Sequence, residues 1–386
     1  MKILHLATDD KFIDHGLRIF KESIPAPHDV IVCAYPPLKY VKLNVSVMTP
    51  MQIFRGLEKV AWTSYALIVL HSLNQNWFPL IKKIPDNIPV VWLGWGLDYY
   101  DILYRRESSL YKDLTFKYWK EKKVARLGGL RPKGMVSRVL KKVLYPSKAS
   151  VLKRVDVFSP VLPSEYELVK KSCGHLKADY LSWNYGNLEE NLIKGFESEV
   201  VKGSAILVGN SAGFTNNHLD SFNILKKIDL NRRKIICPLS YGDPGYASYI
   251  IASGRAQFGD NFVPLVDFMA MNDYVATLCD CGYVIMDHLR QQAVGNIVIM
   301  LYLGAKVFLN DSCPTFAFLK MLGVSVHSIQ ELSERTGLLD KPLSEVERLA
   351  NRSAVLQYWG KAAIEQKTKV LVATAIKNKT GKTIEL

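Results

Sequence analysis

The chain alternates short apolar runs with amphipathic stretches, and this alternation starts twice. In the first half, KILHLAT (Lys2–Thr8) and ALIVLHS (Ala66–Ser72) are apolar runs that each lead into a polar loop. Helical stretches such as Phe12–Ser23 and Met51–Trp62 lie between such runs. Continuous apolar strands separated by helices are typical of a parallel sheet that helices cover on both faces. The remaining strands predicted for this half are Asp29–Ala34, Val90–Gly96 and Val155–Val161.

A second set of strands follows the polar stretch Glu189–Gly203, which has the composition of a linker. The sequence therefore predicts an α/β protein with two facing, doubly wound, Rossmann-like domains. We expect the first domain at 1–190, the second at 204–355, and a helical tail at 356–386 that crosses back to the first domain. The strands predicted for the second domain start with AILVGNS and continue with Lys234–Ser240, Asn261–Val266, Tyr283–Asp287, Lys306–Asn310 and Val324–Ile329.

Length and composition agree with this picture. A chain of 386 residues with 48% hydrophobic residues is long enough for two globular cores. The longest apolar runs, Tyr65–Leu73 and Asn296–Gly304, are well short of the roughly 20 residues that span a bilayer. MKILHLATDD at the N-terminus has the pattern of a strand and not of a signal peptide, so we expect a cytoplasmic protein. The six scattered cysteines predict buried packing positions.

The net charge of +14 is concentrated in one segment. Residues 105–154 hold 16 Lys or Arg and 3 acidic residues, so they carry +13. Aromatic residues are interspersed among the lysines, which indicates two basic amphipathic helices inserted at 105–150 in the first domain. Docking on an anionic membrane surface is one interpretation, and an ordinary solvated helical excursion is another. Nucleic-acid binding is disfavoured because no recognisable nucleic-acid module accompanies the segment. The expected membrane contacts are Lys117, Trp119, Lys122 and Lys141.

Small and amide residues follow the first strand of the second domain. Gly209, Asn210 and Ser211 would let a ligand approach the backbone closely and would supply hydrogen-bond donors. His218 then opens a helix, whose N-terminal N–H groups favour an anion. Tyr241 lies in the loop after the next strand. These residues predict a phosphate-binding edge, although an ordinary strand–turn–helix would show the same pattern.

Several polar residues crowd the strand-to-helix junction after Tyr283–Asp287. Arg290 could pair with a phosphate, and Gln291, Gln292 and Asn296 could hydrogen-bond sugar hydroxyl or amide groups. A solvated loop would not need so many of these groups directly before a deeply apolar helix. We therefore expect a donor site that these four residues share with Gly209, Asn210, Ser211, His218 and Tyr241.

In the first domain, candidate acceptor residues follow two strands. Trp95 offers a face for a sugar ring, and Asp9 follows the first strand. Asp98 is a carboxylate among aromatic residues, where a raised pKa would suit a general base, although an Asp before a helical turn is equally typical of a helix cap. His15 and His218 are the next candidate bases. The sequence has no D-x-D motif for a metal-bound diphosphate, so we expect no metal and no cofactor.

Four motifs together resemble the family 56 glycosyltransferases, the TDP-N-acetylfucosamine:lipid II N-acetylfucosaminyltransferase family. They are ILVGNSxxxxNxH (Ile206–His218), P-x-x-Y (Pro238–Tyr241), RQQxxGN with its sequel (Arg290–Asn310) and W-x-x-WGxDxY (Trp92–Tyr100). The resemblance implies a GT-B fold and a TDP-activated 4-acetamido-4,6-dideoxyhexose donor. It also implies an undecaprenyl-diphosphate-linked acceptor at the cytoplasmic face of the bacterial inner membrane, in common-antigen or O-antigen synthesis. A nucleotide-sugar epimerase and a non-catalytic nucleotide-sugar binding protein remain alternatives.

Overall fold

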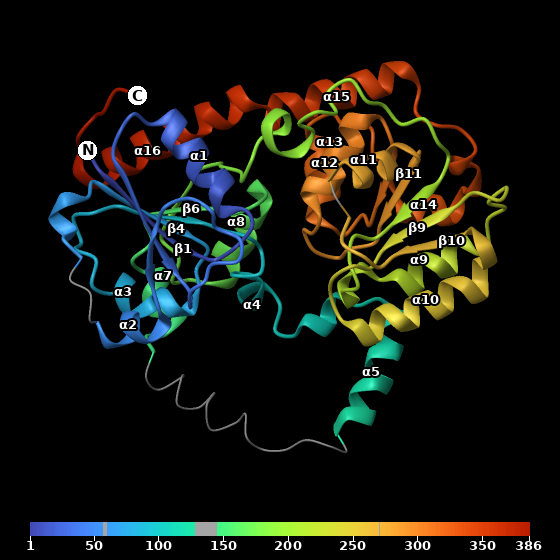
Figure 1. Cartoon of the computed structure of the whole chain (residues 1–386), viewed down its shortest axis with the longest axis horizontal. Coiled ribbons are helices and arrows are strands. Elements are labelled where there is room, and N and C mark those ends of the chain that lie inside the picture. The colour runs from blue at the N-terminus through green and yellow to red at the C-terminus, as the bar shows by residue number, and fades with distance from the viewer. Residues whose placement is uncertain (57–59, 128–144, 270) are drawn as a thin grey trace. The chain divides into compact units, whose positions relative to one another are not determined.

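The computed structural model describes residues 1–56, 60–127, 145–269 and 271–386, and these residues form two compact units. The first unit contains 1–104, the described part of 131–191, and 359–386; the second contains the described part of 105–130 and 192–358. Each unit has its own sheet with helices around it (Figure 1). The predicted α/β class with two parallel sheets is confirmed.

The first unit is built on a seven-stranded sheet whose order is β3-β2-β1-β4-β5-β6-β7 and whose strand pairs are all parallel. Its central strands are buried along their length, as their continuous apolar sequences require. The strands are β1 (Ile3–Thr8), β2 (His28–Cys33), β3 (Ser46–Met48), β4 (Leu67–His71), β5 (Val90–Leu93), β6 (Val157–Ser159) and β7 (Asp179–Tyr180).

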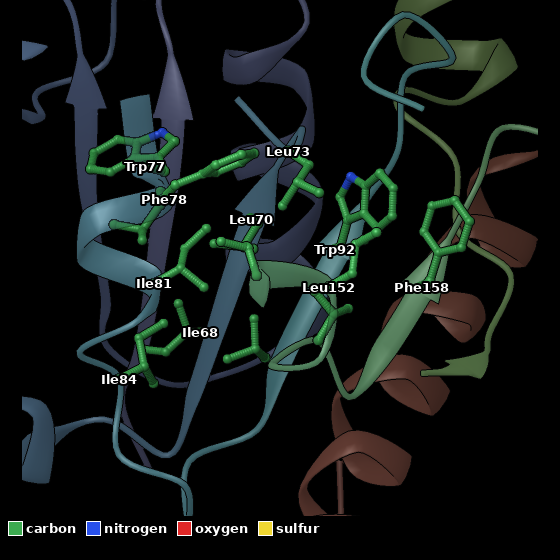
Figure 2. Packing of buried hydrophobic residues seen from close by; sticks show 14 of the residues in the cluster. Ile68, Leu70, Leu73, Trp77, Phe78, Ile81, Ile84, Trp92, Leu152 and Phe158 are labelled. Carbon is green, nitrogen blue, oxygen red and sulfur yellow. The ribbon is translucent and has the colours of Figure 1, made fainter. Parts of the chain in front are cut away.

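Apolar clusters on both faces hold the helices of the first unit against this sheet. On one face, Trp92 stacks on Phe158 with ring centroids 4.0 Å apart, and Trp77 is fully buried (Figure 2). On the other face, the C-terminal helix α16 buries Ile364 and Leu371 against the sheet and α1. The helices of this unit are α1 (Ile13–Ser23), α2 (Pro50–Arg55), α3 (Phe78–Ile81), α4 (Tyr100–Leu103), α7 (Lys148–Leu152), α8 (Pro163–Ser172) and α16 (Lys361–Thr380).

The second unit has a six-stranded parallel sheet in the order β10-β9-β8-β11-β12-β13. Its first strand, β8, lies in the middle, and the chain builds outward to β10 before it returns to β11 on the other side of β8. The strands are β8 (Ile206–Val208), β9 (Ile235–Pro238), β10 (Phe262–Leu265), β11 (Tyr283–Met286), β12 (Lys306–Leu309) and β13 (His327–Ser328). The helices are α9 (His218–Leu225), α10 (Pro244–Phe258), α11 (Met271–Cys279), α12 (Val294–Leu303), α13 (Pro314–Met321), α14 (Ile329–Glu334) and α15 (Glu345–Trp359).

The basic segment differs in part from its expected place, because its residues 105–127 belong to the second unit, whereas its residues 145–150 belong to the first as predicted. Its helix α5 (Asp113–Leu127) lies against α9 (Figure 1). The Asp220 carboxylate of α9 accepts hydrogen bonds from the backbone N–H groups of Leu114 and Thr115, at 3.0 and 3.1 Å, and so caps the start of α5. The ring of Tyr118 stacks on Tyr249 of α10 at 3.8 Å. These contacts fasten the segment to the second sheet's helices.

Candidate functional site

The polar residues predicted for a donor site gather at the carboxyl edge of the second sheet. Strand β8 pairs with β9 on one side and with β11 on the other, so the order in which successive strands are added to the sheet reverses at β8. Ligands of open α/β sheets bind outside the carboxyl ends of the strands at such a switch point. The loops after β8, β9 and β11 all end at this edge, and they carry Gly209, Tyr241 and Arg290.

Three side chains from these three loops form one hydrogen-bonded cluster. The Asn210 amide donates to the Tyr241 hydroxyl at 2.7 Å, and the Gln292 amide donates to Asn210 Oδ1 at 2.9 Å. Gln292 Oε1 in turn accepts a hydrogen bond from the Thr215 hydroxyl at 2.7 Å. Tyr241 is nevertheless 56% exposed, so the cluster opens to solvent on one side. The sequence prediction that Asn210, Tyr241 and Gln292 share one site is consistent with this geometry.

The turn at Gly209 needs a glycine. Its φ is +69°, and a Cβ at this position would lie 2.6 Å from the ring Nε2 of His218 and 2.9 Å from Asn216 Oδ1. Asn216 supports the turn from behind: its Oδ1 accepts from the Asn210 backbone N–H at 2.8 Å, and its amide donates to Ser211 Oγ at 3.1 Å. His288 Nε2 lies 3.0 Å from the same Oδ1 and must therefore carry the proton. The loop is thus held rigid before any ligand arrives.

His218 opens α9 as the sequence predicts, but its side chain does not reach the edge where the donor site is expected. Its ring is fully buried behind Gly209, beside Phe222 and Tyr246, and neither ring nitrogen has a hydrogen-bond partner among the described residues. Burial lowers the pKa of His218 to about 3, so the ring is neutral. With no exposed surface, His218 is a core residue, and the geometry gives it no contact with a donor. The sequence predicts which residue begins the helix, but it does not predict where the side chain of that residue points.

Arg290 and the start of α12 bring positive charge to this edge. The side chain of Arg290 is half-exposed and donates to the Gln291 carbonyl at 3.0 Å. The N-cap of α12 is Ala293, in the left-handed region at φ +56°, and it offers no side-chain cap to the helix. The first N–H groups of α12 and the Arg290 guanidinium therefore leave positive potential beside Gln292. Gln291 is buried, and Asn296 in the first turn of α12 donates to the Tyr274 hydroxyl at 3.3 Å.

A buried ion pair lies behind this edge, and sequence reasoning missed it. Lys112 of the basic segment binds Asp287 at 2.8 Å, directly after β11. Burial raises the pKa of Asp287 to about 6, although Lys112 and the Asn310 amide at 2.8 Å both lower it. Asn217 donates to the Asp287 carbonyl and accepts from the Lys112 backbone N–H, at 2.8 and 2.9 Å. The only signal in the sequence is an acidic residue at the end of an apolar strand.

In the first unit, the side chain of the predicted acceptor residue Asp9 is hydrogen-bonded to the backbone of a loop. Its carboxylate accepts backbone hydrogen bonds from Lys39, Tyr40 and Val41 at 2.6 to 2.9 Å. Partial burial alone would raise the pKa of Asp9, but these three N–H groups lower it below its ordinary value. The side chain thus closes the loop after β2, and its geometry does not support a contact with an acceptor.

Asp98, the first predicted base, has a carboxylate that hydrogen-bonds to residues after two neighbouring strands. Its Oδ2 accepts from the Leu73 backbone N–H at 2.8 Å and from the Trp92 indole at 2.7 Å, and its Oδ1 accepts from the Trp95 backbone N–H at 2.8 Å. Burial raises the pKa of Asp98, and these same hydrogen bonds lower it in part. A carboxylate that joins the ends of β4 and β5 in this way is better suited to positioning the two tryptophans than to taking a proton.

His15, the second predicted base, has its basic nitrogen occupied. The Asn191 amide donates to His15 Nδ1 at 2.8 Å, and Asn191 Oδ1 accepts from the Asn187 backbone N–H at 2.8 Å, which fixes the amide's orientation. The proton of the neutral ring is therefore on Nε2. Burial lowers the pKa of His15, and nearby Arg18 lowers it further. His15 is arranged to donate a hydrogen bond, not to accept a proton.

Trp95 remains as the predicted acceptor residue with an accessible aromatic surface. Its indole is half-exposed at the carboxyl edge of the first sheet. Phe12 and Tyr185 both stand edge-on to it, with ring centroids at 6.3 and 5.4 Å. Phe12 is itself 44% exposed.

The predicted membrane residues lie on α5 as far as they are described. Lys117 and Lys122 are exposed, and Trp119 is half-exposed between the rings of Tyr111 and Phe116. Lys141 lies outside the residues that the structure describes. Throughout the described chain, every helix is too short or too polar to cross a membrane.

Comparison with known proteins agrees with this arrangement. Residues 170–338 match the family described as "4-alpha-L-fucosyltransferase glycosyl transferase group 56", which confirms the resemblance to family 56. The solved structure of the lipopolysaccharide outer core galactosyltransferase WaaB is similar over 98% of this chain and 100% of its own, with a TM-score of 0.63 and 9% identity. For HepE of Anabaena, solved with UDP-glucose, the shares are 97% and 100%, the TM-score 0.61 and the identity 12%. Sucrose-phosphate synthase of Thermosynechococcus elongatus is similar over 98% of this chain and 100% of its own, with a TM-score of 0.62 and 10% identity. These likenesses confirm the GT-B fold.

Proposed function

We propose that this protein, a glycosyltransferase with the GT-B fold, transfers a 4-acetamido-4,6-dideoxyhexose from a TDP-sugar to an undecaprenyl-diphosphate-linked oligosaccharide. The reaction would belong to the synthesis of a surface polysaccharide such as common antigen or O-antigen. The observation that carries the donor half of this proposal is the cluster of Asn210, Tyr241 and Gln292 beside Arg290 and the uncapped start of α12.

The donor diphosphate would lie between the Gly209 turn and the N-terminus of α12. Gly209 allows close approach of the backbone, and Arg290 with the first N–H groups of α12 would balance the negative charge. Negative charge grows on the leaving diphosphate as the bond to the sugar breaks, so these fixed positive groups would stabilise the transition state more than the ground state. HepE, a protein of similar fold, was solved with UDP-glucose, which supports a nucleotide-sugar donor here.

The sugar of the donor would contact the polar cluster. The buried Asn210 is joined to Gln292 by one amide hydrogen bond and to the exposed Tyr241 by another, so amide and hydroxyl groups line this edge. Amide groups of this kind suit the hydroxyl and acetamido groups of a hexose. The matched family is described by a fucosyltransferase activity, and fucose is a deoxyhexose, which supports a deoxy sugar as the transferred group.

A thermal-shift screen of nucleotide-sugars tests the donor. We expect TDP-sugars to raise the melting temperature more than UDP- or GDP-sugars at equal concentration, because a ligand that binds only the folded state stabilises it. A 100-fold excess over Kd corresponds to about 2.7 kcal/mol of stabilisation. A larger shift with UDP- or GDP-sugars would contradict the TDP assignment, and no shift with any of them would contradict a nucleotide-sugar donor.

An epimerase is the second candidate, since a UDP-N-acetylglucosamine 2-epimerase from Listeria monocytogenes has a related fold, with a TM-score of 0.51 and 11% identity. Incubation of the protein with a TDP-sugar but without acceptor distinguishes the two activities. An epimerase would form a new sugar isomer, whereas a transferase would leave the donor intact. A non-catalytic binding protein would bind the donor and transfer nothing to any lipid-linked acceptor.

The exposed side of α5 supports the second half of the proposal, a lipid-linked acceptor at an anionic membrane surface. Phe116, Lys120 and Lys123 follow one another at helical spacing on this side, and Lys123 lies over the Trp119 ring at 4.8 Å. The opposite side of α5 buries Thr115 and Tyr118 against the second unit. Aromatic side chains flanked by lysines are typical of helices that lie in the membrane interface.

Charge reversal tests this membrane contact. We expect replacement of Lys117, Lys120 and Lys123 by Glu to abolish cosedimentation with phosphatidylglycerol vesicles, since each basic residue near such a surface contributes about 1 kcal/mol. The matched control replaces Lys234, Lys320 and Lys341, three exposed lysines of the same unit, and so changes the net charge equally. Wild-type binding should weaken as salt rises. Equal loss of binding in both triple variants would show a general charge effect and would contradict docking through α5.

A further inference from the structure

Three histidines of the first unit form a continuous hydrogen-bonded chain that the proposed reaction does not use. His71 at the end of β4 lies with its Nε2 3.0 Å from Nδ1 of His5 on β1, and His5 Nε2 lies 3.0 Å from Nδ1 of His28 on β2. One end of the chain meets the Tyr185 hydroxyl, 2.8 Å from His71 Nδ1. The other end meets the carbonyl of Ile24, 3.1 Å from His28 Nε2. The chain thus runs from the carboxyl edge of the sheet to the end of α1.

The Ile24 carbonyl fixes the direction of every hydrogen bond in this chain. A carbonyl can only accept, so His28 Nε2 carries a proton and His28 Nδ1, in a neutral ring, must accept from His5. The same reasoning places the protons on His5 Nε2 and His71 Nε2, and it leaves His71 Nδ1 to accept from Tyr185. Neutral rings are what the surroundings favour, because burial lowers the pKa of all three histidines and nearby Lys21 lowers those of His5 and His28 further.

The Tyr185 end of the chain contacts Trp95, whose indole is only partly exposed. His5 and His71 are fully buried, and Phe20 of α1 packs edge-on against both rings. Tyr185 is partly exposed and stands at 86° to the Trp95 indole. Its ring leaves no spare room beside α1, since a Cβ on Gly16 would come within 3.0 Å of it. The hydrogen bond to His71 therefore sets the position of the ring that supports Trp95.

We propose that the chain Tyr185–His71–His5–His28, directed by the Ile24 carbonyl, is a positioning device that holds Tyr185 and Trp95 as a platform for a sugar ring of the acceptor. This proposal rests on the proposed function for the identity of its ligand. The platform takes the apolar face of a pyranose, and the chain keeps it in one orientation. The tautomers of the histidines and the binding of a sugar can both be measured without glycosyl transfer. Failure of the transfer reaction and failure of this proposal can therefore be told apart.

The first readout is the tautomer of each ring, from ¹⁵N NMR of the full-length protein at neutral pH. His5, His28 and His71 should all be neutral with the proton on Nε2. An Nδ1–H tautomer or an imidazolium at any of the three positions would overturn the proposal.

Substitutions at His28, at the far end of the chain, test whether the direction is transmitted. His28→Leu removes the anchor, so His5 and His71 should show mixed tautomers. His28→Gln should restore the Nε2–H form, because its amide can donate to Ile24 and accept from His5. If the single tautomer persists in His28→Leu, the chain does not set its direction in the way proposed.

The second readout is sugar binding, measured with di-N-acetylchitobiose as the probe and followed at the Trp95 indole resonance. Tyr185→Phe keeps the ring and removes one hydrogen bond, and the Kd should rise about tenfold. Tyr65→Phe is the control, since Tyr65 donates a comparable bond to Asp29 at 2.6 Å in the same unit, and it should leave the Kd unchanged. Equal affinity in Tyr185→Phe and wild type, or no binding to the wild type, would overturn the proposal.

Discussion

Replacement of Arg290 by alanine is expected to reduce kcat/KM for the nucleotide-sugar by roughly 100- to 1,000-fold, the range seen when one fixed group that stabilises transition-state charge is removed. Arg290 stands directly after β11, and the uncapped start of α12 follows it. Without the guanidinium, the first N–H groups of α12 would have to balance the diphosphate without its help. Donor binding should weaken as well, because the ground-state diphosphate is already charged.

Steady-state kinetics with varied donor, together with donor titration by thermal shift, measure this effect. Arg255→Ala is the matched control, because Arg255 is an exposed arginine in the last turn of α10 in the same unit. Arg290→Lys should fall between wild type and Arg290→Ala, since it keeps the charge and loses the bidentate fork. If Arg290→Ala keeps normal kcat/KM and donor affinity, the diphosphate does not bind at this edge.

The alternation of apolar runs was sufficient to predict both sheets and to bring the residues of the proposed donor site to one edge. The carboxyl ends of parallel strands meet at one edge, so residues after β8, β9 and β11 had to come near one another whatever the details of the loops. This is why Asn210, Tyr241 and Gln292, which are far apart in the sequence, could be assigned to one site.

The direction and pairing of individual side chains could not be predicted in this way. His218 and Asp98 both lie in loops that follow strands. The His218 ring points into the core, and the Asp98 carboxylate accepts hydrogen bonds from three N–H groups. The basic segment gave a similar error, because chain continuity placed it with the first domain. The Lys112–Asp287 ion pair and the Asp220 cap fasten residues 105–127 to the second unit. Contacts between residues so far apart in the sequence leave no periodic signal in it.

The protein is expected to lose stability steeply between pH 6.5 and pH 5, because several histidines are buried and neutral. Burial lowers the pKa of His71, His218 and His288 to about 3, whereas an unfolded histidine titrates near 6.5. Below pH 6.5 these histidines therefore bind protons in the unfolded chain but remain neutral in the folded protein. The stability these groups contribute is complete above pH 6.5 and is lost as the pH falls toward 3.

Asp287 opposes this trend over part of the range. Burial raises its pKa to about 6, so between pH 6 and its ordinary value of about 3.8 the folded protein binds a proton that the unfolded chain does not. Each group changes the free energy of unfolding by about 1.4 kcal/mol per pH unit within its window. These three histidines alone cost about 4 kcal/mol per pH unit from pH 6.5 to pH 6. Below pH 6 Asp287 reduces the slope to about 3 kcal/mol per pH unit, so about 5 kcal/mol should be lost by pH 5. That is a large fraction of the 5–15 kcal/mol typical of a folded protein.

Urea unfolding at a series of pH values measures this slope, and His218→Leu isolates one contribution to it. His218 has no hydrogen-bond partner among the described residues, so its replacement removes a titrating group without breaking a bond. The variant should be less sensitive to acid by about 1.4 kcal/mol per pH unit, whatever its stability at neutral pH. His175→Leu, at an exposed position, should keep the wild-type slope. If His218→Leu also keeps it, His218 is protonated in the folded protein, and its ring cannot be enclosed behind Gly209 as the structure places it.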